Sequence, residues 1–103
     1  MARRLLYGVG PNVVLKIEQL SNGTQRTLVL SGRIESSNVQ QLRVQIDGNE
    51  RDLVLDLAQV RIVDRDAVRF LAECERKGIE LRDCPPFVRA WILSEQPRAG
   101  ELE

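Results

Sequence analysis

Apolar and polar residues alternate, or recur every three to four positions, in successive segments of the chain. Residues 13–19 show the period of two that is typical of a half-buried strand, with apolar odd-numbered positions from 13 to 17. A second β-rich run covers residues 27–31. The turn-forming residues Ser21, Asn22 and Gly23 lie between them, so the pattern predicts a hairpin.

Two further strands are predicted later in the chain. Residues 53–57 are apolar on both faces, apart from Asp56, which is typical of a strand covered on both sides or central in a sheet. Residues 79–82 alternate again between apolar and charged side chains. We therefore expect four strands, with the third at the centre of the core.

Apolar residues at helical spacing predict about three helices. The first is expected to begin at a capping box of Ser37 and Gln40, the second at a capping Asp64, and the third at Pro85 and Pro86. Their predicted apolar faces are Val39, Leu42 and Ile46, then Ala67, Phe70, Leu71 and Cys74, then Phe87, Val88, Trp91 and Ile92. Helices between strands imply parallel crossovers. The fold class is α/β, with a mixed four-stranded sheet made of an N-terminal hairpin plus parallel strands and flanked by the helices.

The length of 103 residues fits one domain. We place it at residues 13–93, after an N-terminal segment at 1–12 and before a flexible tail at 94–103. No apolar run approaches the ~20 residues of a membrane helix, so no membrane insertion is expected. Two cysteines that form no C-x-x-C pair, with no secretory segment ahead of them, predict a cytoplasmic protein.

Composition narrows the chemistry. The 15 cationic and 15 acidic residues balance, which disfavours nucleic-acid binding. The absence of His removes the commonest general base and zinc ligand, so we expect no enzyme and no cofactor. Asp64 and Asp66 alone provide too few ligands for a metal ion, so no metal site is expected. Cys74 and Trp91 are interpreted as packing residues, and a reactive Cys84 is the minor alternative.

Residues 28–35 (LVLSGRIE) and 53–60 (LVLDLAQV), followed by Ile62, Val63 and Asp64, resemble the STAS domain of sulfate transporters and anti-sigma factor antagonists. The resemblance covers about residues 13–93. It implies a switch loop after Asp64, where the family carries a Ser or Thr that a partner kinase phosphorylates. This chain has Arg65 there, followed by Asp66, Ala67 and Val68. Because Arg has no hydroxyl, no phosphorylation is expected at Arg65.

The resemblance therefore implies a non-catalytic domain that binds a kinase-like anti-sigma factor in the regulation of transcription or signalling. The predicted partner-binding residues are Arg33, Ile34, Glu35, Asp64, Arg65, Asp66, Ala67, Val68 and Arg69, with Ile34, Ala67 and Val68 as an apolar patch. Two points stay open: whether Asp66 acts as a constitutive negative charge, and whether Ser36 or Ser37 is phosphorylated instead. The oligomeric state is also open.

Two alternatives remain. One is an accessory subunit of a transporter ATPase or a signalling scaffold. The other is a small-molecule sensor that uses Asp64 and Asp66 together with Cys84.

Overall fold

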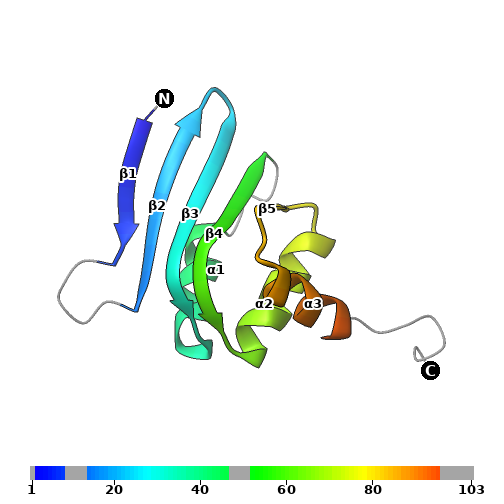
Figure 1. The fold of residues 1–103 in the computed structure, drawn as a ribbon. Helices are drawn as coiled ribbons and strands as arrows, with labels where there is room; N and C mark the ends of the chain where they lie inside the picture. Colours follow the sequence, from blue (N-terminus) through cyan, green and yellow to red (C-terminus); the bar gives the residue numbers. More distant parts are fainter. Residues whose placement is uncertain (1, 9–13, 47–51, 96–103) are drawn as a thin grey trace.

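The structure is a computed structural model that describes residues 2–8, 14–46 and 52–95. Five strands form one sheet in the order β1-β2-β3-β4-β5 (Figure 1). The first three are antiparallel neighbours, and β4 and β5 then continue the sheet in parallel with β3. The strand bounds are β1 Ala2–Tyr7, β2 Leu15–Asn22, β3 Gln25–Ile34, β4 Leu53–Val63 and β5 Glu80–Arg82.

The mixed sheet of the predicted α/β fold is confirmed, with one strand more than expected. The additional strand, β1, lies within the N-terminal segment at 1–12 and pairs antiparallel with β2. Most of the stretch between β1 and β2 lies outside the described residues. The β2–β3 hairpin is confirmed, because Leu15 pairs with Gly32 and Asn22 pairs with Gln25.

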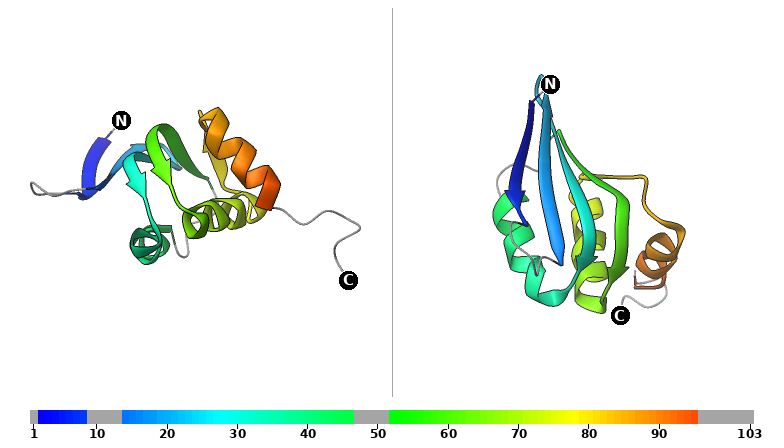
Figure 2. Two further views of the ribbon diagram at one scale, coloured as in Figure 1. Left: turned by 60° about the horizontal axis from the view of Figure 1, so that its bottom comes forward. Right: turned by 60° about the vertical axis from the view of Figure 1, so that its left-hand side comes forward.

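Three helices are present, α1 (Ser36–Ile46), α2 (Arg65–Arg76) and α3 (Pro86–Glu95). Figure 2 shows α1 and α2 beneath one face of the sheet, with α3 beside α2 at the edge that β5 forms. The helix α3 ends at Glu95 and so extends two residues into the tail expected at 94–103, the rest of which lies outside the described residues.

The core lies between the sheet and the helices. Strand register places Ile17 beside Leu30, and Leu28 beside Leu55, on the same face of the sheet. From the helices, the core receives Leu42, Ala67, Leu71, Val88 and Ile92, none of which has any exposed surface. The predicted apolar face of α2 is therefore confirmed, including the buried Cys74.

The apolar face predicted for α3 is right at three of its four residues. Val88 and Ile92 are buried and Trp91 packs against the core, as expected, but Phe87 is 47% exposed. Phe87 lies about 100° around the helix from Val88, and only the Val88 side faces α2 and the sheet.

Helix α1 begins one residue before the predicted capping box. Ser36 is its first residue, and Glu35 takes the capping position. The Asn38 side-chain oxygen accepts a hydrogen bond from the Glu35 amide at 3.0 Å, and the Asn38 amide donates to the Glu35 carbonyl at 2.8 Å. The bond to the Asn38 side chain is one half of a capping box, but the second bond runs to the Glu35 backbone carbonyl and not to its side chain. The residues at this helix start are Glu35 and Asn38 rather than the predicted Ser37 and Gln40.

Candidate functional site

The candidate site is the end of the molecule where β3 and β4 finish side by side. Ile34 pairs with Val63 in the parallel ladder, and the Asp64 amide donates to the Ile34 carbonyl at 3.3 Å. Each strand then turns into a helix, β3 into α1 and β4 into α2 (Figure 1). Because parallel strands end at the same edge, two helix N-termini with free amide donors meet here.

Asp64 joins the two helices. One carboxylate oxygen accepts a hydrogen bond from the Ala67 amide in the first turn of α2 at 2.9 Å. The other accepts a hydrogen bond from the Ser36 amide at the start of α1 at 2.7 Å. The predicted capping role of Asp64 is confirmed, and the same side chain also binds the neighbouring helix, which the sequence pattern did not indicate.

The polar residues predicted to contact a partner surround this capped junction. Arg33 and Glu35 flank the end of β3 with a 3.6 Å ion pair between them. Arg65 and Asp66 occupy the first turn of α2, and Arg69 follows one turn later. All except Glu35 are exposed, and Arg65 and Arg69 expose 67% and 59% of their side chains.

The predicted apolar patch is wrong. Ile34, Ala67 and Val68 have no exposed surface and belong to the core. Ile34 is the last residue of β3 and its side chain lies under the sheet, while Ala67 and Val68 lie on the inner side of α2. The site therefore presents polar and charged side chains, held over an apolar support.

Glu95 is a site residue that the sequence analysis missed, because it was assigned to the tail. Its carboxylate contacts the Arg65 Nε at 3.6 Å and the Arg69 Nε at 3.3 Å, and accepts a hydrogen bond from the Trp91 indole at 3.4 Å. The hydrogen bond from Arg69 holds the pKa of Glu95 below its usual range. The four-residue spacing of Trp91 and Glu95 was the one signal for this contact.

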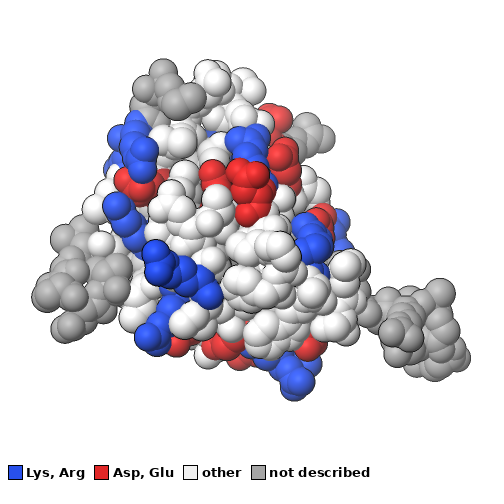
Figure 3. Space-filling view, viewed as in Figure 1, with Lys and Arg blue, Asp and Glu red and all other residues white. Residues whose placement is uncertain are grey.

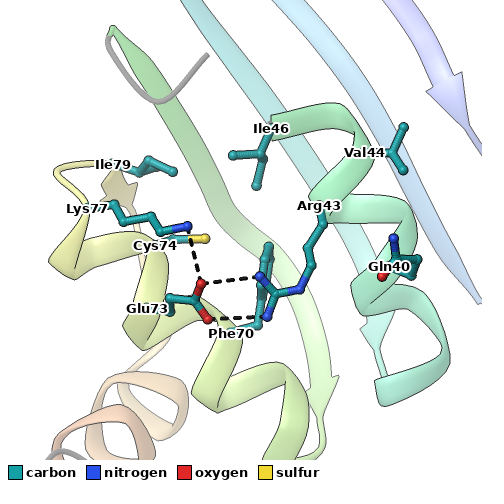
Figure 4. A pocket seen from close by; sticks show the side chains of 9 residues that line it. All are labelled: Gln40, Arg43, Val44, Ile46, Phe70, Glu73, Cys74, Lys77 and Ile79. Carbon is teal, nitrogen blue, oxygen red and sulfur yellow. Dashed lines mark hydrogen bonds and ion pairs between the residues drawn. The ribbon is translucent and has the colours of Figure 1, made fainter. Parts of the chain in front are cut away.

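A second charged cluster lies between α1 and α2, away from the strand ends. The Arg43 guanidinium on α1 donates two hydrogen bonds of 3.2 Å to Glu73 on α2, and lies 5.0 Å from the centre of the Phe70 ring (Figure 4). Lys77 contacts the same carboxylate at 3.2 Å. The cluster lies beside a small cavity of about 270 Å³.

The geometry gives little support to a metal site at Asp64 or to a reactive Cys84. Both carboxylate oxygens of Asp64 already accept backbone hydrogen bonds, which leaves a weak ligand for a cation. Among residues 2–8, 14–46 and 52–95, no group of three His, Cys, Asp or Glu side chains could hold a metal ion. Burial raises the pKa of the Cys84 thiol, which opposes the reactive thiolate considered for the sensor alternative.

The similarity of this chain to known proteins lies in its fold. No protein-family model matches the sequence, and no curated protein matches it. A solved STAS domain of an anti-sigma-factor antagonist from Rhodobacter sphaeroides matches 74% of this chain and 97% of its own, with a TM-score of 0.54 and 18% identity. The chain has the STAS fold.

A second solved structure, of a protein named Mglu, matches 66% of the chain with a TM-score of 0.53 and 22% identity. Here the STAS-fold chain spans only 19% of the length of the matched protein. A similar fold therefore also occurs as a small part of a much longer chain. In the described part of the present chain, no helix has the length and apolar character needed to cross a membrane.

Proposed function

We propose that this STAS-fold chain is a non-catalytic protein-binding domain of the anti-sigma factor antagonist type. It binds a kinase-like anti-sigma factor in the cytoplasm and so releases a sigma factor from inhibition. The binding residues are the polar side chains around the capped junction: Arg33, Glu35, Arg65, Asp66 and Arg69.

The observation that carries this proposal is the double capping by Asp64. Its two hydrogen bonds, of 2.9 and 2.7 Å, fix the first turns of α2 and α1 relative to each other. Two loops that are separate in sequence therefore form one preorganised surface. Binding to such a surface loses less conformational entropy than binding to two mobile loops.

Residue 65 determines whether the proposed domain can be switched by phosphorylation. The side chain is exposed at the first position of α2, but a guanidinium cannot accept a phosphoryl group. The domain therefore binds its partner without a covalent switch at this position.

Restoring a hydroxyl tests the proposal. The wild-type chain and an Arg65→Ser variant are incubated with ATP and purified kinase-like anti-sigma factors encoded in the same genome, and binding and phosphate incorporation are both measured. Wild type is expected to bind without incorporating phosphate, whereas Arg65→Ser gains phosphate at residue 65. The matched control is Arg76→Ser, the same substitution at the other end of α2, which gains none.

Stoichiometric phosphate on wild-type Ser36 or Ser37, located by mass spectrometry, contradicts a domain without a switch. Failure of the wild-type chain to bind any of these factors contradicts the proposed partner class. Binding to a transporter ATPase subunit in the same assay supports the accessory-subunit alternative instead.

A further inference from the structure

The cavity of about 270 Å³ beside Arg43 lies between the last turns of α1 and α2 (Figure 4). Its lining includes an apolar floor of residues from both helices and from the segment that leads into β5. Each floor residue is at most 5% exposed, so the floor is narrow: Ile46, Phe70, Cys74 and Ile79. A floor of this width fits a single hydrocarbon chain rather than a broad apolar surface.

Two cations and one carboxylate line the same cavity. The Glu73 carboxylate accepts two hydrogen bonds of 3.2 Å from the Arg43 Nη groups and contacts the Lys77 ammonium at 3.2 Å. The remaining polar residue of the lining is Gln40, which is uncharged. The lining therefore carries one positive charge in excess, and the cavity favours an anion over a neutral or cationic molecule.

Both cations keep free donors for such an anion. Arg43 uses its two Nη groups for Glu73, and no described residue accepts a hydrogen bond from its Nε. The Lys77 ammonium has three N–H groups, and Glu73 is its one side-chain partner in the described part of the chain. The two side chains are 42% and 52% exposed, so solutes can reach them. A carboxylate in the cavity can bind these donors while Glu73 stays in place.

Charge alone does not set this cluster apart. Cationic and acidic residues lie side by side at several places on the face that Figure 3 shows, and Glu95 also pairs with two arginines. However, Ala72 is the one apolar residue in the described lining of the groove beside Glu95. Five of the nine residues that line the cavity beside Arg43 are apolar. This cavity thus combines an excess cation with an apolar wall.

The volume of the cavity limits its occupant. A water molecule takes up ~30 Å³ in the liquid, so 270 Å³ corresponds to roughly nine water molecules. We infer that the cavity binds a small aliphatic monocarboxylate with a chain of about five to eight carbons. The chain lies along Ile46, Phe70 and Ile79, and the carboxylate pairs with Arg43 and Lys77. This site is separate from the capped junction, and the inference does not depend on the proposed function.

Hexanoate is the probe that tests the inference. It is titrated into the isotope-labelled wild-type chain, and binding is followed by two-dimensional NMR. We expect saturable shifts at the amides of Arg43, Val44 and Ile79, with a dissociation constant of about 1 mM or below. Hexanol and hexylamine carry the same chain without the negative charge, and acetate carries the charge without the chain. All three are expected to bind at least fivefold more weakly.

The two lysines of the chain provide a matched pair of variants. Lys77→Gln removes the cation beside the cavity, whereas Lys16→Gln removes one on β2 that is similarly exposed and also contacts a glutamate. Both variants lower the net charge equally. Lys77→Gln is expected to weaken hexanoate binding about threefold, the range of one exposed ion pair, and Lys16→Gln is expected to leave it unchanged. Circular dichroism checks that both variants fold.

Four results would overturn the inference. They are the absence of saturable shifts up to about 10 mM hexanoate, shifts confined to residues away from the cavity, equal affinity for hexanol, and an equal effect of the two lysine variants. The last result would mean that hexanoate responds only to the overall charge of the protein. No anti-sigma factor is present in these titrations, so their outcome leaves the proposed function to its own test.

Discussion

Asp64 is the residue on which the geometry of the site depends. Its carboxylate accepts hydrogen bonds from Ala67 and Ser36, in the first turns of two different helices. A residue that caps a single helix satisfies only one set of free amides. Loss of this side chain therefore affects two helix starts together.

Asp64→Ala is expected to lower the free energy of unfolding by about 2 kcal/mol, the upper end of the range for a single cap, because two amide donors lose their acceptor. Urea denaturation followed by circular dichroism measures this. Asp66→Ala is the control: its carboxylate gains only from the helix dipole, and its loss is expected to cost less than about 1 kcal/mol. Equal losses for the two variants contradict the double cap.

Glu73 gives the protein a pH-dependent contribution to stability. Hydrogen bonds from Arg43 hold its pKa below the ordinary value of 4.5, with Lys77 adding to the effect. A carboxyl group whose pKa is lowered by folding stabilises the native state above its unfolded pKa, and this contribution is lost as the pH falls through the folded pKa.

The melting temperature of Glu73→Gln is accordingly expected to lie below that of wild type at pH 7 and to approach it as the pH falls below 4.5. Thermal denaturation across this range measures the convergence. Because the cluster is partly exposed, 1 M salt is expected to narrow the difference at pH 7 as well. A difference that is the same at every pH excludes the ion pair as its cause.

At the scale of elements, helix periodicity was the most informative sequence signal. The spacing of Ala67, Phe70, Leu71 and Cys74 identified the buried face of α2 correctly. The same reasoning misplaced one residue of α3, Phe87, because Phe87, Ala90 and Leu93 are apolar on its outer face as well. Periodicity locates the buried side of a helix only when the other side is polar.

Leu71 provides the quantitative check on α2. It is fully buried, so Leu71→Ala is expected to lower the free energy of unfolding by about 3 kcal/mol through lost burial and the cavity left behind. Leu93→Ala makes the same substitution at an exposed position of α3 and is expected to change stability by less than about 0.5 kcal/mol. Chemical denaturation of both variants gives the comparison, and a large loss for Leu93→Ala means that the outer face of α3 is already covered.

Strand β1 escaped prediction for a local reason. In its sequence, two arginines (Arg3 and Arg4) are followed by two leucines (Leu5 and Leu6), so apolar and polar residues do not alternate. Among the side chains of β1 that the structure describes, only Leu6 packs against the core, and Leu5 is 43% exposed. The strand is stabilised by its pairing with β2 and by the two hydrogen bonds from Arg3 to Glu18. Such long-range contacts leave little trace in a short sequence window.

The positions of the polar residues of the candidate site could be predicted from the sequence. The exposure of the apolar residues beside them could not. The resemblance placed Arg33, Glu35, Arg65, Asp66 and Arg69 at the ends of adjacent parallel elements, and the structure brings them to one end of the molecule. It could not show which neighbouring apolar residues are exposed, because that depends on how helices and strand ends pack. Glu95 was missed for the same reason, since its partners lie 26 and 30 residues earlier in the chain.

The whole molecule is a sheet with helices on one face. On the other face, among the described residues, Val29 and Val54 are still only 6% and 2% exposed. Their neighbours across the strands include Glu18 and Glu80. Long charged side chains can cover apolar residues with their methylene groups while their charges stay in water. This arrangement accounts for buried valines on a face without helices.

The shortness of β5 divides β4 into two parts. Strand β5 pairs only with Val54, Leu55 and Asp56, so from Ala58 to Val63 the described part of the sheet holds β4 through β3 alone. Hydrogen exchange monitored by NMR is expected to be faster at amides of the second part that point away from β3 than at amides of the first part. Uniform protection along β4 contradicts this division.

The less protected part of β4 leads directly into Asp64 and the proposed binding surface. A partner that binds there contacts a part of β4 that the sheet holds on one side only. Its binding energy is expected to add to the protection of that part. The three residues of β5 thereby set which part of β4 is expected to open locally. They also make slowed amide exchange at the end of β4 the most sensitive sign that a partner has bound.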